Sequence, residues 1–257
     1  MTQLAAQRRN KILDMIREDG HVRVNVLAKA FDVTEVTIRQ DLERMEQEHL
    51  LRRVHGGAVL LDTDNRVESL SVLNRDNLPA KQAIAREAVK RINDGETVIL
   101  DSGSTTTEIA KLLNTGYQNL NVITNALNIA LILGKNPGIS VNVTGGEFKS
   151  PTLSLTGQRA ADYFRGLHAD KAFLATAGIN IQTGLTYPSI SDLPVKRAMI
   201  ECADKVYLVA DSTKIGRSAF ATLGPLSLVD HVITDSNISS ADRELFDKYR
   251  LKVIIAG

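Results

Sequence analysis

The stretch TEVTIRQDLERM, residues 34–45, decides how the first part of the chain folds. Thr34 is a residue type that commonly caps the start of a helix, and Ile38, Leu42 and Met45 then recur at i, i+4 and i+7. At helical spacing these apolar side chains share one face, so the stretch predicts a helix with a core face and a polar face. The outward half carries Val36 and Gln40, flanked by Thr37, Arg39 and Arg44.

Two shorter helical patterns precede this helix, and a basic hairpin pattern follows it. The first pattern stops near Gly20 and the second near Asp32, both residue types that favour a turn. LLRRVHGGAVL, residues 50–60, reads as two short extended runs around a diglycine. Three short helices and a hairpin predict a winged helix-turn-helix domain over residues 1–60. The hairpin projects the side chains Arg52, Arg53 and His55.

A winged helix-turn-helix gives the polar face of the third helix a use, because such a helix enters the major groove of double-stranded DNA by its N-terminus. Arg39 and Gln40 would meet base edges or phosphates, and the hairpin would contact phosphates or the minor groove. The alternative is a merely solvated polar face. Residues 1–58 hold ten Lys or Arg and nine Asp or Glu, so the domain is not a polycation. Clustering of the basic residues on the helix and hairpin favours DNA.

The N-terminal part resembles the DeoR family of bacterial transcriptional regulators. The family's basic hairpin ending in a diglycine is matched by RRVHGG, residues 52–57, and one departure is Arg23, where a Ser or Thr often caps the second helix. The spaced match consists of Arg8, Ile12, Ile16, Thr34, Thr37, Ile38, Arg39, Gln40, Asp41 and Leu42. The resemblance and the helix pattern together imply DNA contacts by Thr34, Val36, Thr37, Arg39, Gln40, Arg44, Arg52, Arg53 and His55.

Residues 61–78 read as a linker, and residues 79–257 alternate apolar strands with helices. Near-continuous apolar strands between helices predict an α/β domain whose mostly parallel sheet is covered on both faces. The chain is therefore expected to consist of a DNA-binding domain, a linker and an α/β effector domain. The strand candidates are residues 97–101, 121–124, 139–143, 170–175, 205–210, 230–234 and 252–255.

Ligands of such sheets bind beyond the carboxyl ends of the strands, so the loops there carry the functional information. DSGSTTT, residues 101–107, runs from a strand into a helix, and its hydroxyls and helix N-terminal amides can cradle an anion. The alternative is a well-capped turn. TN at 124–125 and TGGE at 144–147 follow strands and can converge on the same mouth. Lys214 follows another strand, where its ammonium can pair with a phosphate or form a surface salt bridge with Asp211.

This set resembles the C-terminal domain of the DeoR family, which is similar in fold to ribose-5-phosphate isomerase and binds phosphorylated sugars. LDSGSTTTEIA, VITNALNIA, TGG and VKRAMIECADKVYLVADSTKIGR match its pattern in order, and LDSGSTT resembles repressors of galactitol, sorbitol and amino-sugar catabolism most closely. Asp192 matches an acidic position of the family, with helix capping as the alternative. The implied effector contacts are Asp101, Ser102, Gly103, Ser104, Thr105, Thr106, Asn125, Gly145, Gly146, Asp192, Lys196, Arg197 and Lys214.

The stretch FLATAGINIQTGLTY, residues 173–187, speaks against catalysis. An aldose-ketose isomerase needs a carboxylate to move a proton between neighbouring carbons, and Ala177 and Asn180 stand where acids would be needed. We therefore expect no enzyme, no catalytic residue and no cofactor or metal. The alternatives are an isomerase-like enzyme with an accessory DNA-binding domain and an architectural DNA binder without an effector.

Composition and targeting signals fit a regulator inside the cell. The net charge is +1, the single Cys202 excludes an intramolecular disulfide, and the N-terminus lacks the apolar run of a signal peptide. No segment approaches the roughly 20 apolar residues of a membrane span. We expect a cytoplasmic homodimer or homotetramer that represses a carbohydrate catabolic operon by binding double-stranded operator DNA, under control of a phosphorylated sugar.

Overall fold

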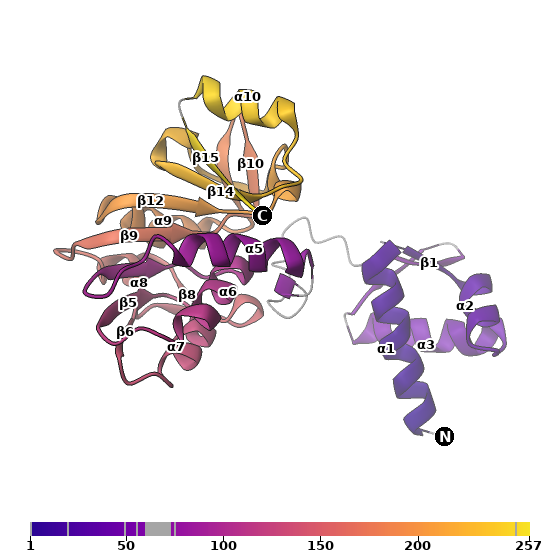
Figure 1. The fold of residues 1–257 in the computed structure, drawn as a ribbon. Helices are drawn as coiled ribbons and strands as arrows, with labels where there is room; N and C mark the ends of the chain where they lie inside the picture. Colours follow the sequence, from indigo (N-terminus) through magenta and orange to yellow (C-terminus); the bar gives the residue numbers. More distant parts are fainter. Residues whose placement is uncertain are drawn as a thin grey trace. The chain divides into compact units, whose positions relative to one another are not determined.

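The computed structural model describes residues 2–19, 21–48, 50–54, 56–59, 73–74, 76–249 and 251–257. The chain divides into two compact units, Met1–Asp64 and Asn65–Gly257, and each has a hydrophobic core of its own (Figure 1). The expected DNA contact His55 and most of the expected linker, residues 61–72 and 75, lie outside the described residues. None of the helices in the described part combines the length and the apolar character needed to cross a membrane.

The first unit consists of three helices and a small antiparallel sheet. The apolar positions of all three helix patterns are buried in one cluster that includes Ile12, Leu27 and Ile38. The expected winged helix-turn-helix is confirmed. Its helices are α1 (Thr2–Asp19), α2 (Val24–Ala30) and α3 (Glu35–Gln47), and its strands are β1 (His21–Arg23), β2 (Arg52–Val54) and β3 (Gly57–Val59).

The small sheet has the order β1-β3-β2, so the hairpin also pairs with a strand that precedes α2. The sequence pattern did not predict β1, because three residues are too few to show a strand period. Gly57 is required at the junction, since a Cβ there would lie 2.0 Å from the backbone oxygen of Val22. As the departure at Arg23 indicated, α2 begins without a side-chain cap.

The second unit is built on a seven-stranded sheet in which every neighbouring pair of strands is parallel. Each strand overlaps one of the seven strand candidates, so the expected parallel α/β architecture is confirmed. The strands are β4 (Thr97–Leu100), β5 (Leu120–Thr124), β6 (Ile139–Val143), β9 (Ala169–Leu174), β12 (Ala203–Val209), β14 (His231–Asp235) and β15 (Lys252–Ala256).

Helices cover both faces of this sheet, as the near-continuous apolar strands predicted. Successive side chains of β4 alternate between two cores: Val98 and Leu100 pack with one group of helices, and Ile99 packs with the other. The first group is α5 (Leu78–Val89), α6 (Ser104–Leu113) and α7 (Leu127–Leu133) (Figure 1). The second group is α8 (Gln158–Asp162), α9 (Leu193–Glu201) and α10 (Ser240–Lys248).

Two small antiparallel sheets complete the second unit. The sequence pattern predicted neither of them, because their strands have only three or four residues. One is the hairpin of β7 (Glu147–Lys149) and β8 (Ser154–Thr156), and the other has the order β10-β11-β13. The strands of the second are β10 (Gly178–Asn180), β11 (Gly184–Tyr187) and β13 (Ala221–Gly224).

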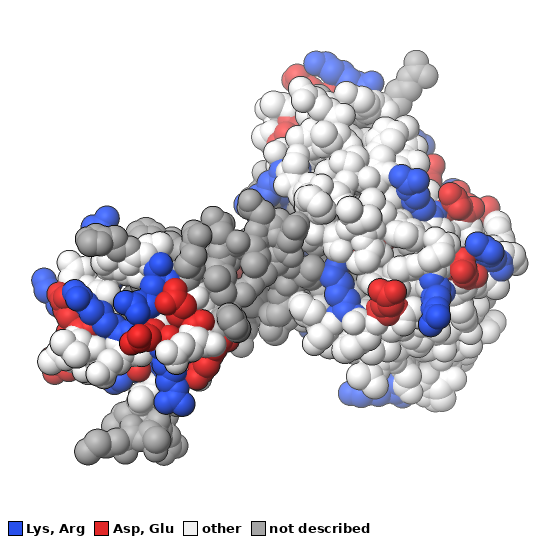
Figure 2. Space-filling model, turned by 180° about the vertical axis from the view of Figure 1, so that it is seen from behind, with Lys and Arg blue, Asp and Glu red and all other residues white. Residues whose placement is uncertain are grey.

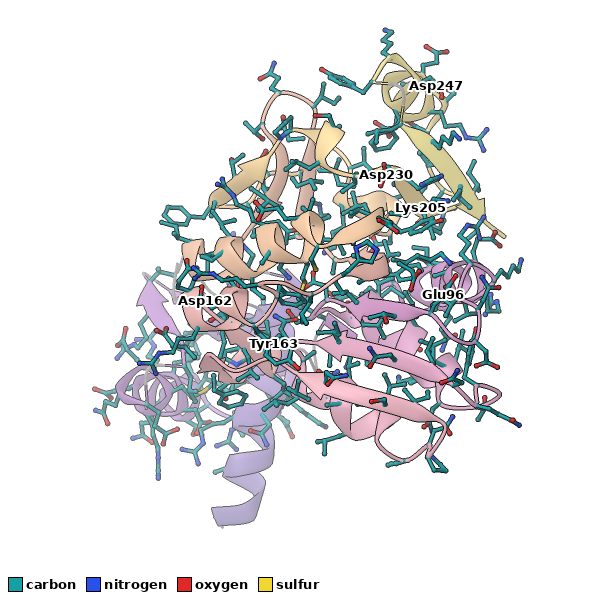
Figure 3. The ribbon with its side chains drawn as sticks, turned by 90° about the vertical axis from the view of Figure 1, so that its left-hand side faces the viewer. Glu96, Asp162, Tyr163, Lys205, Asp230 and Asp247 are labelled. Atoms are coloured by element: carbon teal, nitrogen blue, oxygen red, sulfur yellow. The ribbon has the colours of Figure 1, made fainter. Side chains whose placement is uncertain are left out.

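Carboxylates near the amino ends of the parallel strands join neighbouring strands. Asp170 and Asp230, near the amino ends of the strands, accept hydrogen bonds from the backbone N–H groups of Thr97 and Val206, each at 2.8 Å. Figure 3 labels Asp230 with Glu96, which directly precedes β4. Asp170 and Asp230 thus hold neighbouring strands together at the end of the sheet opposite the pocket.

Candidate functional site

Helix α3 displays most of the expected DNA contacts on its exposed face. Thr34 accepts a hydrogen bond from the backbone N–H of Thr37 at 3.2 Å, so it caps the helix as its position predicted. Val36 is 64% exposed. Arg39 and Gln40 are exposed too, while Ile38 is fully buried. The helix therefore separates a core face from an outward face as the sequence indicated.

Basic side chains of α3 and β2 lie beside acidic ones. Arg39 Nη2 lies 3.1 Å from Glu35 Oε2, and Arg44 Nε lies 3.2 Å from Glu48 Oε1. Lys or Arg and Asp or Glu side chains are interspersed over the face of this unit that Figure 2 shows. Exposed pairs of this kind contribute about 1 kcal/mol or less, so a phosphate can replace the carboxylate at small cost.

The hairpin is described in part. The backbone of Arg52 lies in β2, but its side chain and His55 lie outside the described residues. Arg53 Nη1 lies 3.9 Å from Glu43 Oε1, and its backbone N–H donates to Glu46 Oε1 at 2.8 Å. The carboxylates of α3 thus fix the position of β2 relative to the helix.

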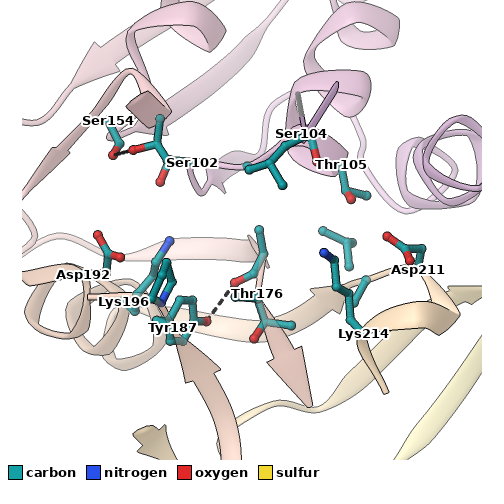
Figure 4. Close-up of a pocket in the computed structure, with 18 of the residues that line it drawn as sticks. Ser102, Ser104, Thr105, Ser154, Thr176, Tyr187, Asp192, Lys196, Asp211 and Lys214 are labelled. Carbon is teal, nitrogen blue, oxygen red and sulfur yellow. Dashed lines mark hydrogen bonds between the residues drawn. The ribbon is translucent and has the colours of Figure 1, made fainter. Parts of the chain in front are cut away.

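A pocket of about 340 Å³ lies at the carboxyl ends of β4, β9 and β12, a size typical of small-molecule sites (Figure 4). Strand order reverses between β4 and β9, because β5 and β6 extend the sheet to one side and β9, β12, β14 and β15 extend it to the other. Such a switch point is where open α/β sheets bind ligands. The expected effector contacts that line it are Ser102, Gly103, Ser104, Thr105, Asp192, Lys196 and Lys214.

A buried ion pair lies beneath the first loop. Asp101 is fully buried and accepts hydrogen bonds from Lys196 Nζ, from Ser102 N at 2.7 Å and from Ala175 N at 3.0 Å. Burial raises the pKa of the Asp101 carboxyl, and Lys196 and the two N–H groups act against that rise. Lys196 Nζ also lies 5.1 Å from the ring centre of Tyr187. Asp101 therefore orients the lining residue Lys196 from behind the pocket wall.

Two further expected contacts support the first loop without lining the pocket. Asn125 accepts a hydrogen bond from Ser102 N at 2.9 Å and donates to Leu155 O at 3.0 Å, so it joins the loop to the β7–β8 hairpin. Thr106 Oγ1 donates to Gly103 O at 3.0 Å. A Cβ at Gly103 would lie 2.6 Å from that of Ala175, which explains the glycine.

The remaining expected contacts, Gly145, Gly146 and Arg197, are not among the pocket-lining residues of the described part. Gly146 has a φ of +124° and packs against the backbone of Thr156, so it shapes the hairpin. Arg197 Nη2 donates to Leu223 O at 3.1 Å. Gly146 and Arg197 thus contact neighbouring elements, whereas a Cβ at Gly145 would meet nothing within 4 Å.

The alternative roles considered for two acidic residues are wrong. Asp192 directly precedes α9, but its side chain makes no cap hydrogen bond, and both carboxylate oxygens accept from Lys149 Nζ at 2.8 Å. Asp211 is 1% exposed and accepts hydrogen bonds from Asn77 and Thr213. Within the described residues it forms no surface salt bridge with Lys214. Lys149 is a pocket residue that sequence reasoning missed, because the hairpin that carries it was not predicted.

Lys81 was also missed, and it is the most unusual residue of the pocket. Its side chain is almost fully buried, and Nζ donates to the backbone oxygens of Leu73 and Asp76, both at 2.5 Å. Burial lowers the pKa of Lys81, while Asp211 acts against that shift. A signal was present: Lys81 shares a helical face with Ile84, Ala85 and Ala88, where a charge needs a reason.

The two ends of the pocket differ in whether their cations have carboxylate partners. At the end labelled by Asp192 and Lys196 in Figure 4, both lysines have carboxylate partners, Lys149 with Asp192 and Lys196 with Asp101. At the end labelled by Asp211 and Lys214, two further lining cations lie near Lys214: Lys81, whose pKa is affected by Asp211 and Lys214, and Arg217, whose backbone N–H donates to Lys214 O at 3.4 Å. The described residues include no carboxylate within ion-pair distance of these three cations. Asp211 is the acidic residue lining that end. The excess positive charge suits a dianion.

No three His, Cys, Asp or Glu side chains gather into a possible metal site in the portion of the chain that the structure describes.

Comparison with known proteins gives matches over almost the full length. The sequence model described as "DeoR-like helix-turn-helix domain" matches residues 8–64, and that described as "DeoR C terminal sensor domain" matches residues 76–236. The HTH-type transcriptional regulator GolR of Listeria innocua is 34% identical over 97% of this chain and 98% of its own. The glycerol-3-phosphate regulon repressor of Escherichia coli K12 is 32% identical over 90% of each chain. Ribose 5-phosphate isomerase A of Methanocaldococcus jannaschii superposes with a TM-score of 0.42 at 16% identity, over 55% of each chain.

Proposed function

The chain belongs to the DeoR family of transcriptional regulators, and from that premise we propose that it represses a carbohydrate catabolic operon under control of a phosphorylated sugar or polyol. The observation that carries the proposal is the pocket end formed by Lys81, Lys214 and Arg217, where cations lack carboxylate partners in the described residues. The winged helix-turn-helix in the same chain is the domain whose DNA binding the ligand would control. The isomerase alternative is not supported, since the relatives matched over 90% or more of both chains are named as a regulator and a repressor.

The DNA partner follows from the outward face of α3. We propose that α3 enters the major groove of double-stranded operator DNA and that Arg39, Arg44 and Arg53 exchange their glutamate partners for phosphates. Because each arginine is paired and exposed, this exchange releases carboxylates to water at small cost. A homodimer or homotetramer would present α3 twice to a palindromic operator.

The ligand is proposed to bind with its phosphate at the Lys214 end of the pocket. The hydroxyls of Ser104 and Thr105 and the N-terminus of α6 face this space and add hydrogen-bond donors (Figure 4). One relative is named for the glycerol-3-phosphate regulon, which makes a small phosphorylated polyol the first class to test.

Carbon-bound hydroxyls are proposed to bind at the opposite end. There Lys149 and Lys196 offer donors and Asp192 offers an acceptor, while Ser102 and Ser154 can do both. Since each ammonium is already neutralised by a carboxylate, this end favours a neutral polyol over a second anion.

Lys81 is proposed to couple the pocket to the DNA-binding unit. Its ammonium holds the carbonyl groups of Leu73 and Asp76, and Asn77 donates to Asp211, which lines the pocket, and to the neighbouring Thr213. An incoming phosphate would attract the Lys81 ammonium away from those carbonyls and so change the hold on residues 73–77, which lead back toward the DNA-binding unit in the sequence. A coupling of about 1 to 3 kcal/mol changes DNA occupancy five- to more than a hundredfold.

The test is fluorescence anisotropy of the full-length protein on DNA from upstream of its own gene, at stated salt. Glycerol 3-phosphate and a panel of hexose and hexitol phosphates are compared with their unphosphorylated parents. We expect one phosphate ester, and not its parent, to change the affinity. Lys214→Met should abolish this response and leave DNA binding intact. Lys205→Met, at an exposed position on β12, the strand that precedes Lys214, is the matched control and should respond normally.

Three outcomes would contradict parts of the proposal. Normal operator affinity of Arg39→Ala would remove α3 from the interface. A normal response of Lys214→Met would place the phosphate elsewhere. Tight DNA binding that is indifferent to every phosphate ester would keep the DNA-binding function and reject the pocket as an effector site.

A further inference from the structure

The outward face of α3 carries two kinds of side chain. Arg39 and Arg44 each hold a glutamate one helical turn away. Val36 and Gln40 differ: Val36 is 64% exposed, and the described residues offer the amide of Gln40 no hydrogen-bond partner. A single exposed valine is ordinary on a protein surface. This one lies in the first turn of the helix proposed to enter the major groove, one turn before Gln40.

The spacing of these two residues matches the spacing of base pairs. Residues i and i+4 lie on one helical face and are separated by about 6 Å along the axis. Base pairs of DNA rise by about 3.4 Å, so the two side chains span at most two base-pair steps. N-terminal residues of a recognition helix are the ones that reach base edges.

The chemistry of the two side chains selects adjacent features of A·T pairs. A glutamine amide can donate to adenine N7 and accept from adenine N6, and an apolar side chain packs against the 5-methyl group of thymine. We propose that in each operator half-site Gln40 reads an adenine and Val36 reads a thymine methyl group within two base-pair steps of it. This inference rests on the proposed DNA-binding function.

Sequence readout and phosphate binding are then divided on one helix. Arg39 and Arg44 are charged, exposed and able to exchange a glutamate for a phosphate, so they hold the helix on any sequence. Val36 and Gln40 carry no charge and contribute little to binding of random DNA. Changes at Val36 or Gln40 should alter which sequence is preferred, whereas changes at Arg39 should weaken binding to all sequences.

Base analogues test the readout one atom group at a time. The half-site is taken from duplexes that the wild-type full-length protein selects from a random library. Each thymine is replaced in turn by deoxyuridine, which lacks the 5-methyl group, and each adenine by deoxynebularine, which lacks the N6 amino group. We expect one thymine position to lose about fourfold in affinity and one adenine position about tenfold.

The variants assign these losses to side chains. Val36→Ala should bind the thymine and uracil duplexes equally while keeping the adenine preference, and Gln40→Leu should do the reverse. Both positions are exposed, so the fold is retained. Arg39→Ala is the control, expected to weaken every duplex by one common factor.

Several results would overturn the inference. Wild-type binding that no analogue weakens, or discrimination that survives both Val36→Ala and Gln40→Leu, would show that other groups read the bases. Loss of discrimination in Arg39→Ala would assign readout to that arginine. If the wild-type protein selects no sequence and binds no duplex, the proposed DNA-binding function fails as well.

Discussion

The outward face of α3 in the first unit and the pocket of the second unit place their ion pairs in opposite ways. In the first unit, Arg39 and Glu35 are one helical turn apart and their side chains keep 61% and 51% of their exposure. In the second unit, Asp101 and Lys196 are 95 positions apart and their side chains are 0% and 5% exposed. The first arrangement leaves charges free to exchange partners, and the second fixes the shape of a pocket.

This difference follows from the tasks proposed for each unit. DNA presents phosphates at a regular surface, and exposed arginines can meet them without refolding. A small ligand must be surrounded, so its pocket needs groups that are desolvated and held in place before the ligand arrives. Breaking a buried pair leaves an uncompensated charge, while breaking an exposed pair returns two groups to water.

The largest effect is expected for Lys196→Met. The variant leaves the Asp101 carboxyl buried without its ammonium partner, which should cost about 3 to 5 kcal/mol of the free energy of unfolding. Burial already raises the pKa of Asp101 in the folded state, and loss of Lys196 should raise it further. A carboxyl with a raised folded pKa is least costly when protonated, so the deficit should shrink as pH falls.

Urea unfolding of the variant at pH 7.5 and pH 5 measures this effect. The double variant Asp101→Asn/Lys196→Met removes both charges and should recover part of the stability at pH 7.5. A loss below about 1 kcal/mol in Lys196→Met would show that the buried pair behaves like the exposed pairs of the first unit, and the contrast between the units would collapse.

The next effect concerns the pocket itself. Ser104→Asp places a carboxylate where the phosphate is proposed to bind. Repulsion between the two anions should weaken the free energy of ligand binding by about 2 to 4 kcal/mol. Folding should be retained, because an acidic residue at the N-terminus of α6 interacts favourably with the helix dipole. Calorimetric titration with the responding phosphate ester measures the loss. Ser104→Ala removes the same hydroxyl without adding charge and should lose far less; equal losses in both variants would argue against an anion at this position.

Structure that depends on residues close together in the sequence, like the ion pairs of α3, was predicted more fully than structure that depends on distant residues, like the buried pair of the pocket. The face assignment of α3 depended only on residues within one helix, and Ile38 and Val36 lie as their spacing predicted. The seven parallel strands were also predicted, because their apolar runs are long enough to show a pattern. Local periodicity suffices wherever the determining neighbours are near in sequence.

The pocket was anticipated in part. Ser102 to Thr105, Lys196 and Lys214 line it, since they follow strands or belong to a motif. Lys149 was missed because three-residue strands leave no periodic signal. Lys81 was missed because its partners are backbone oxygens of Leu73 and Asp76, which no side-chain pattern reveals.

A smaller effect is expected in the pH dependence of the stability of the second unit, through His231. His231 stacks on Tyr207, which stacks on Phe173, with ring centroids 4.8 Å and 5.1 Å apart. Burial lowers the pKa of His231, with Asp230 acting against the shift. The neutral ring is therefore favoured in the folded state, and its contribution to stability is present above the ordinary pKa of about 6.5 and is lost as pH falls below it.

Thermal unfolding of wild type and His231→Phe between pH 7.5 and pH 5.5 measures this contribution. Phenylalanine keeps the stack and cannot take up a proton, so the variant should lose less stability than wild type over this range. Parallel curves for the two proteins would remove His231 from the pH response.

The smallest effect belongs to the exposed pair with which the comparison began. Glu35→Gln frees Arg39 from its carboxylate partner and removes one negative charge from the surface proposed to face DNA. The unfolding free energy should change by less than about 0.5 kcal/mol, as for other exposed pairs one turn apart.

Operator affinity of Glu35→Gln should rise about twofold, a gain of about 0.4 kcal/mol, because Arg39 no longer gives up a partner. The gain should fade at high salt, because salt screens the interactions of Arg39 with the glutamate and with the phosphates alike. Anisotropy titrations at two salt concentrations, with Glu48→Gln beside Arg44 as the second example, decide the matter. Weaker binding by Glu35→Gln would mean that the glutamate positions Arg39 for DNA, so that the exposed pair, like the buried one, is held in place before its ligand arrives.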